Sequence, residues 1–167
     1  MKMMLIIWLG LFNLPMASSE LKLSELRKLY YQAAESSAAS ATLTRTLKTV
    51  DASSAPIFLC YKGAAHMMEA KYTLNPITKL SRFNKGKIAI EQAIERDPDQ
   101  LEMRFIRFSI QVNLPSFLGY KGQIEVDKKK LLAGVGVIND KVLKDNVINY
   151  LIASKKCTKE EIKKLQN

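Results

Sequence analysis

Two arginines on one predicted helix have the types and spacing to do chemistry. Arg104 and Arg107 stand three residues apart and Gln111 follows four residues later, so all three share one helix face. A guanidinium group is planar and presents paired N–H donors that match a carboxylate or a phosphate. The stripe therefore predicts one of two things: binding of an anionic ligand, or internal pairing with acidic residues such as Glu69, Glu91 or Glu102.

A second polar stripe lies earlier in the chain. Lys62, His66 and Glu69 recur at helical spacing on a predicted helix. His66 and Glu69 could assist acid–base chemistry, and the alternative is a histidine that is only a hydrogen-bonded structural residue. His66 is the only histidine in the chain, which excludes a metal site built from several histidines.

Motifs typical of enzymes are missing from the sequence. It has no glycine-rich phosphate loop, no paired-cysteine metal motif and no serine in a nucleophile-elbow context. We therefore expect a protein that is not an enzyme and that uses no cofactor and no metal. A small hydrolase or lyase that uses His66 is the remaining catalytic alternative.

A long predicted loop, residues 113–123, carries several large apolar side chains: Leu114, Phe117, Leu118 and Tyr120. Leaving each of them in water would forfeit about 1.5 to 3 kcal/mol, so the loop should be held against the body of the protein. Long loops in compact domains often carry functional residues. Phe117, Leu118 and Tyr120 are therefore candidate partner contacts.

Helical periodicity extends along the chain after residue 20, and no stretch keeps the alternation of a half-buried strand. The sequence predicts an all-α fold of about seven helices, arranged as antiparallel hairpins. The expected helices span residues 21–35 or 24–35, then 37–50, 56–72, 78–96, 100–112, a stretch from about 125, and 140–154, followed by a short terminal helix. Asp99 with Glu102, and Thr158 with Glu161, have the spacing of capping pairs at helix starts.

One helical pair has the residue spacing of a known repeat. Gly86, Ile90, Ala93 and Pro98 stand at offsets 0, 4, 7 and 12. This pattern resembles the second helix of a tetratricopeptide repeat, in which small residues let two helices approach and a proline ends the second one. In the first helix of the pair, Gly63 takes the small position.

The resemblance is partial. Lys62 and His66 fall where the family has leucine and tyrosine, and the connection between the helices is about ten residues longer than the repeat allows. The resemblance implies a short array whose first helices line a groove, holding these candidate binding residues: Lys62, His66, Glu69, Arg104, Arg107 and Gln111. Residues 58–71 and 102–111 also resemble small uncharacterised exported bacterial proteins, a likeness that implies no mechanism.

The first nineteen residues have the layout of a secretory signal peptide. Lys2 provides a positive start, residues 3–14 form an apolar run, and Ala17 and Ser19 are the small residues of a cleavage site. The apolar run is shorter than the ~20 residues that a membrane-spanning helix needs. We therefore expect cleavage after Ser19, a single helical domain over residues 20–167 and a periplasmic or secreted protein; the alternative is an uncleaved anchor.

The chain is strongly basic. Its net charge is +10, and +9 without Lys2. The lysines form only short clusters, which are typical of solvated helix faces and lack the stacking aromatics of a nucleic-acid surface. We expect no nucleic-acid partner, while attraction to an anionic membrane surface or an acidic polymer is permitted.

Cys60 and Cys157 could form a disulfide after export, and the favoured alternative is a buried free thiol at Cys60.

These features favour an exported helical-repeat module that binds a protein or peptide partner, or scaffolds an assembly, in the cell envelope. The alternative is a peripheral binder of anionic envelope material, either a membrane surface or an acidic polymer. The oligomeric state stays open.

Overall fold

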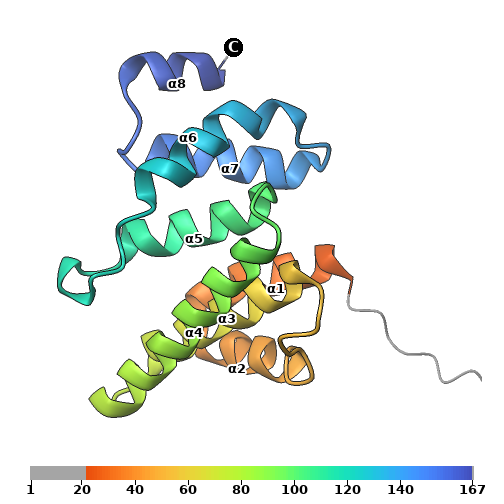
Figure 1. The fold of residues 1–167 in the computed structure, drawn as a ribbon, viewed down its shortest axis with the longest axis vertical. Coiled ribbons are helices and arrows are strands. Elements are labelled where there is room, and N and C mark those ends of the chain that lie inside the picture. Colours follow the sequence, from red (N-terminus) through yellow and green to blue (C-terminus); the bar gives the residue numbers. More distant parts are fainter. Residues whose placement is uncertain (1–21, 167) are drawn as a thin grey trace, which may run out of the picture.

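The computed structural model describes residues 22–166, and within that range it contains helices and no strand, which confirms the expected all-α class. The expected signal peptide, residues 1–19, lies outside the described residues. The α-helices of this range are α1 (Leu23–Glu35), α2 (Ser37–Thr46), α3 (Pro56–Tyr72), α4 (Pro76–Arg96), α5 (Leu101–Asn113), α6 (Ile124–Gly134), α7 (Lys141–Ala153) and α8 (Lys159–Gln166), with 3₁₀ helices at Ser116–Leu118 and Val135–Val137 (Figure 1). None of these helices combines the length and the apolar character that crossing a bilayer requires.

Among the helix ends that differ from the expected positions, those of α2 and α4 have a local cause. Helix α2 ends at Thr46 and not at residue 50, because residues 47–49 form a turn that is closed by a 3.2 Å hydrogen bond from the Val50 amide to the Leu47 carbonyl. Helix α4 begins at Pro76, where the Asn75 side chain caps it. The connection between α3 and α4 is therefore three residues long, because α3 ends at Tyr72 as expected and α4 starts two residues earlier than expected.

One of the two expected capping pairs forms. At the start of α8, the Thr158 amide donates to Glu161 at 2.7 Å and the Glu161 amide donates to the Thr158 hydroxyl at 3.2 Å. The expected pair of Asp99 and Glu102 is wrong: α5 has Gln100 at its N-cap with no side-chain cap. Glu102 does not cap the helix because its carboxylate is buried and binds Arg27 of α1.

Helices α3 and α4 pack closely as a hairpin through two glycines. A methyl group added at Gly63 would lie 2.7 Å from the carbonyl oxygen of Gly86, and one added at Gly86 would lie 2.7 Å from that of Gly63. Ile90 and Ala93 of α4 are fully buried. The small residues that the repeat spacing singled out are thus the ones that allow close approach of these two helices.

Helix α5 separates two hydrophobic clusters (Figure 1). Its residues Met103, Ile106 and Ile110 pack with α1–α4, whereas Phe105 and Phe108 pack with α6 and α7. A helix that is buried on two sides needs two apolar stripes, and the sequence of α5 contains both. Its remaining polar face lies in the seam between the two clusters, where the arginines are found.

Candidate functional site

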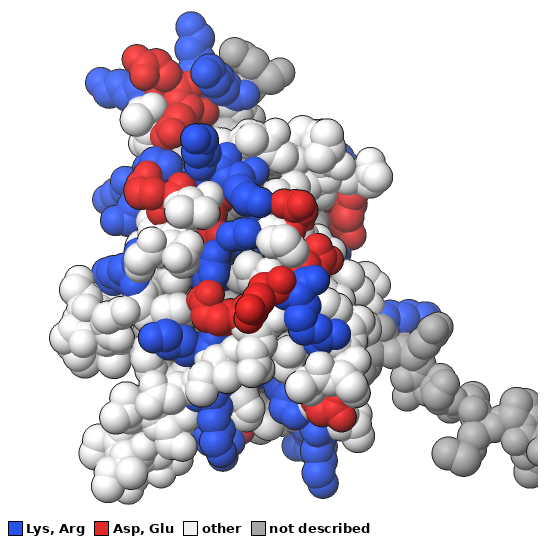
Figure 2. Space-filling view, in the orientation of Figure 1, with Lys and Arg blue, Asp and Glu red and all other residues white. Residues whose placement is uncertain are grey.

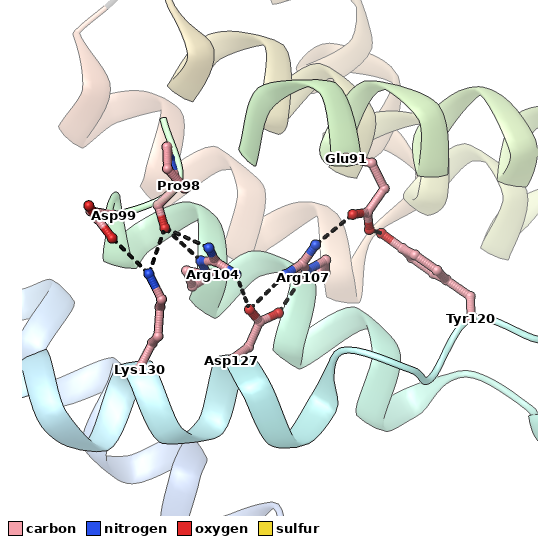
Figure 3. Close-up of polar contacts among 8 residues, drawn as sticks. All are labelled: Glu91, Pro98, Asp99, Arg104, Arg107, Tyr120, Asp127 and Lys130. Carbon is pink, nitrogen blue, oxygen red and sulfur yellow. Dashed lines mark hydrogen bonds and ion pairs between the residues drawn. The ribbon is translucent and has the colours of Figure 1, made fainter. Parts of the chain in front are cut away.

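The arginine stripe of α5 is paired inside the protein. Arg107, 3% exposed, donates to Asp127 of α6 through Nε at 2.7 Å and through Nη2 at 2.8 Å. Its Nη1 donates to Glu91 of α4 at 2.5 Å. Figure 3 shows this guanidinium group between the two carboxylates. All three of its nitrogens have partners, so Arg107 presents no free donor pair to a ligand.

Arg104 is held in the same way. It donates to Asp127 at 3.0 Å and, through two nitrogens, to the Pro98 carbonyl at 2.9 and 2.6 Å. Beside it, Lys130 pairs with Asp99 at 2.7 Å (Figure 3). Internal pairing, one of the two alternatives for the stripe, is therefore the arrangement in the structure. Glu91 was an expected partner, whereas Asp127 was missed because no local spacing links α6 to α5.

Sequence reasoning also missed a buried network around Glu102. This carboxylate accepts hydrogen bonds from Arg27 at 2.8 and 2.9 Å and from the Tyr61 hydroxyl at 2.5 Å. Arg27 also donates to Asp140, at the start of α7, at 2.6 Å. Burial raises the pKa of Tyr61, which therefore remains a hydrogen-bond donor. The network joins α1, α3, α5 and α7 and has the geometry of a structural brace.

Gln111, the third member of the arginine stripe, is fully buried. Within the described residues its side-chain nitrogen and oxygen have no hydrogen-bond partner. It is therefore enclosed and does not face a groove. On a helix that protein surrounds, a polar stripe is as consistent with a buried Gln111 as with a Gln111 that faces a binding groove.

The polar stripe on α3 lies apart from the arginines. Lys62 donates to the Val50 carbonyl, and His66 contacts Glu69 at 2.9 Å. Glu69 also pairs with Arg82 at 3.0 Å. Lys62 and His66 border a shallow hollow of about 270 Å³ whose walls come from α3, α4 and the turn before α3, and not from α5. The expected common groove for the two stripes is therefore not formed.

The loop between α5 and α6 is held against the body, as expected. Tyr120 is 5% exposed, and its hydroxyl donates to Glu91 at 2.5 Å. Its ring stacks edge-on against Phe83 at 6.1 Å, and the Lys87 ammonium lies 5.3 Å from the ring centre. Leu118 is partly buried against the α1–α4 cluster. Of the three expected partner contacts in this loop, Phe117 is the exposed one, at 85%.

The two cysteines are free thiols in the structure. Cys60 is fully buried in the α1–α4 cluster, and Cys157 packs partly buried against the other cluster. Because they belong to different clusters, no bridge joins them, and the favoured alternative for Cys60 agrees with the structure. Burial raises the pKa of both thiols.

The outer side of α4 carries a group of large apolar side chains that are exposed to water. Four apolar side chains are exposed on this helix and just before it, and we name them the α4 face: Leu74, Ile77, Leu80 and Ile88. Leu74 is 98% and Ile77 80% exposed. Figure 2 shows an uncharged protrusion at the lower left, where α4 begins in Figure 1, with basic side chains beside it. Packing among the described residues does not account for this exposure.

The segment that bears the α4 face carries only basic charges, although Glu69 of α3 pairs with one of them, Arg82, at 3.0 Å. Between Glu69 and Glu91 the sequence contains no acidic residue and five basic ones: Lys71, Lys79, Arg82, Lys85 and Lys87. Exposed apolar side chains flanked by lysines are typical of helices that lie in a membrane interface. The α4 face therefore replaces the arginine stripe as the candidate binding surface.

Comparisons with protein-family models, with curated proteins and with solved structures found no match.

Proposed function

We propose that this protein is an exported, non-catalytic peripheral binder of anionic membrane surfaces in the cell envelope, and that it docks through the α4 face. The observation that carries the proposal is the coincidence of exposed Leu74, Ile77, Leu80 and Ile88 with a stretch that has five basic and no acidic residues. The expected signal peptide supports the location. Of the two anionic materials, a membrane surface and an acidic polymer, the proposal names the membrane.

An anionic bilayer fits both properties of this surface. Its phosphate-rich layer attracts cations by about 1 kcal/mol for each lysine or arginine close to it. The boundary between headgroups and acyl chains accepts the apolar side chains that water does not. An acidic polymer would satisfy the lysines alone and would leave Ile77 and Leu80 exposed, so the apolar residues favour a membrane.

A protein or peptide partner remains the second candidate. The close contact of Gly63 with Gly86 supports the proposal that α3 and α4 form one tetratricopeptide-like unit. The α4 face is also apolar enough to contact another protein. The expected groove residues do not favour this candidate, because Arg104 and Arg107 are bound to internal acceptors.

The test uses the chain from Glu20, which contains every described helix, and vesicles of phosphatidylcholine with or without phosphatidylglycerol. We expect co-sedimentation with the anionic vesicles only, and release at 1 M salt, where the screening length falls to about 3 Å. Ile77→Ser and Leu80→Ser should each weaken binding. The matched control is Val142→Ser, which replaces an exposed apolar residue of α7.

Three results would contradict the proposal. The first is equal binding to neutral and anionic vesicles, and the second is no binding to either. The third is an equal effect of the α4 variants and of the Val142 control. Absence of vesicle binding together with saturable binding of a defined protein would favour the second candidate.

A further inference from the structure

We infer that the loop of residues 114–123 is a second membrane-contacting element, in which Phe117 enters the bilayer interface and Tyr120 is the positioning residue that holds it. This inference rests on the proposed function and extends it to a surface outside α4. The α4 face and the loop would thus contact the same anionic bilayer.

The loop presents Phe117 from a defined backbone. Residues Ser116–Leu118 form a 3₁₀ turn with hydrogen bonds from the Leu118 amide to the Pro115 carbonyl at 3.2 Å and from the Gly119 amide to the Ser116 carbonyl at 3.1 Å. Gly119 then reverses the chain at φ 63°, a left-handed conformation that favours glycine. Phe117 is therefore exposed on an ordered turn.

The residues around Phe117 are anchored. Leu114 and Leu118 pack against the α1–α4 cluster, and Tyr120 is buried three residues after Phe117. The loop thus packs its other large side chains against the body and leaves one aromatic ring, 85% exposed, in water. Phenylalanine, with tryptophan and leucine, is typical of the apolar surfaces that enter the boundary between headgroups and acyl chains.

Tyr120 connects the loop to the charged seam of the protein. Its hydroxyl donates to one oxygen of Glu91, and Arg107 donates to the other at 2.5 Å. Arg107 in turn binds Asp127. Figure 3 shows this continuous series from α6 through α5 and α4 to the loop. Because these bonds connect the loop to three helices, the exposed ring of Phe117 has a fixed position.

The anchor joins the loop to the same helix that bears the α4 face. Tyr120 stacks on Phe83, six residues after Ile77 on the same helix and therefore about 9 Å along its axis. In Figure 1 the loop and the beginning of α4 project toward the same side of the molecule.

The charge of the loop matches that of the α4 face. No acidic residue occurs between Glu102 and Glu125, and Lys121 lies in the loop itself. The same anionic surface can therefore meet both elements, with Phe117 and Ile77 as apolar contacts and the lysines against phosphate groups.

A tryptophan probe tests the inference directly. Trp8 is the only tryptophan of the chain, so the form beginning at Glu20 has none. We expect Phe117→Trp to show a blue-shifted emission and protection from acrylamide when phosphatidylglycerol vesicles are added, and to lose both at 1 M salt. Val142→Trp, on an exposed site of α7, should show neither change.

Two substitutions separate insertion from positioning. Phe117→Ser should lower the vesicle partition coefficient roughly tenfold, since one exposed aromatic side chain loses its transfer into the interface. Tyr120→Phe keeps the ring and removes the hydroxyl that binds Glu91. In the Phe117→Trp background it should reduce the blue shift while binding through α4 persists; an unchanged shift would overturn the positioning role.

The outcomes distinguish this inference from the proposed function. Vesicle binding that depends on Ile77, together with an indole that stays accessible to acrylamide in the Phe117→Trp variant, would overturn the inference and leave the proposed function intact. Absence of vesicle binding by the unsubstituted protein would overturn both. A blue shift of the Phe117→Trp variant with no effect of Ile77→Ser would support the loop contact and contradict docking through the α4 face.

Discussion

Arg107 and Asp127 are joined by two hydrogen bonds, from Nε to Oδ2 at 2.7 Å and from Nη2 to Oδ1 at 2.8 Å. Asp127 is fully buried and also accepts a hydrogen bond from Arg104 at 3.0 Å. One carboxylate therefore compensates two guanidinium groups between α5 and α6. This arrangement explains why the most chemically suggestive stripe of the sequence is structural.

Removing that carboxylate charge should destabilise the protein. We expect Asp127→Asn to lower the free energy of unfolding by about 3 kcal/mol, the low end of the 3–5 kcal/mol typical for breaking a buried ion pair. The low end is expected because Arg107 keeps Glu91 and Arg104 keeps the Pro98 carbonyl. Urea denaturation measures the effect. Asp145→Asn, which removes an exposed partner of Lys141, should change stability little; equal effects would contradict the prediction.

The contact between α3 and α4 should not tolerate a side chain at Gly63. Alanine normally stabilises a helix by about 0.5 to 1 kcal/mol relative to glycine. Here the added carbon would lie 2.7 Å from the Gly86 carbonyl oxygen and 2.9 Å from the Ile90 amide nitrogen. We expect Gly63→Ala to destabilise by about 1–3 kcal/mol in thermal or urea unfolding. Gly136→Ala, where the added carbon meets open space, is the control, and a stabilised Gly63→Ala protein would refute the packing argument.

The two thiols should differ in accessibility. Cys60 is fully buried, and burial also raises its pKa, so it should not react with a thiol reagent until the protein unfolds. Cys157 is partly exposed with a raised pKa, so its reaction should be measurable and should accelerate at higher pH. We expect one thiol in a native titration and two in denaturant. Cys157→Ser should abolish the native reaction; a native protein with no titratable thiol would contradict this assignment.

Acid should weaken the ion pair between Arg27 of α1 and Asp140 at the start of α7. The Leu143 amide and then Arg27 hold the pKa of Asp140 below its ordinary value of 3.8. A lowered pKa in the folded state stabilises the protein above pH 3.8, and that stabilisation is lost as the pH falls below it. Unfolding measured from about pH 5 down to about pH 1 should therefore show a decline, mostly below pH 3.8, that Asp140→Asn reduces. An identical decline in the variant would exclude Asp140 as a source.

Local patterns in the sequence predicted most of the helices. Residues three and four apart on a helix share a face, so the two apolar stripes of α5 could be recognised before their partners were known. The reciprocal cap of Thr158 and Glu161 was predictable because both residues lie within one turn. The cap expected at Asp99 failed because Glu102 binds Arg27, a residue 75 positions away.

The sequence alone determined the helical class, the burial of α5 on two sides and the excess of positive charge. Only the tertiary structure decided which charges neutralise one another and which apolar residues stay exposed. Helical periodicity depends on neighbours within a turn or two, whereas the pairing of Arg107 with Asp127 and the exposure of Phe117 depend on which helices meet. That choice depends on packing across the whole chain, and a spacing rule within one segment contains no information about it.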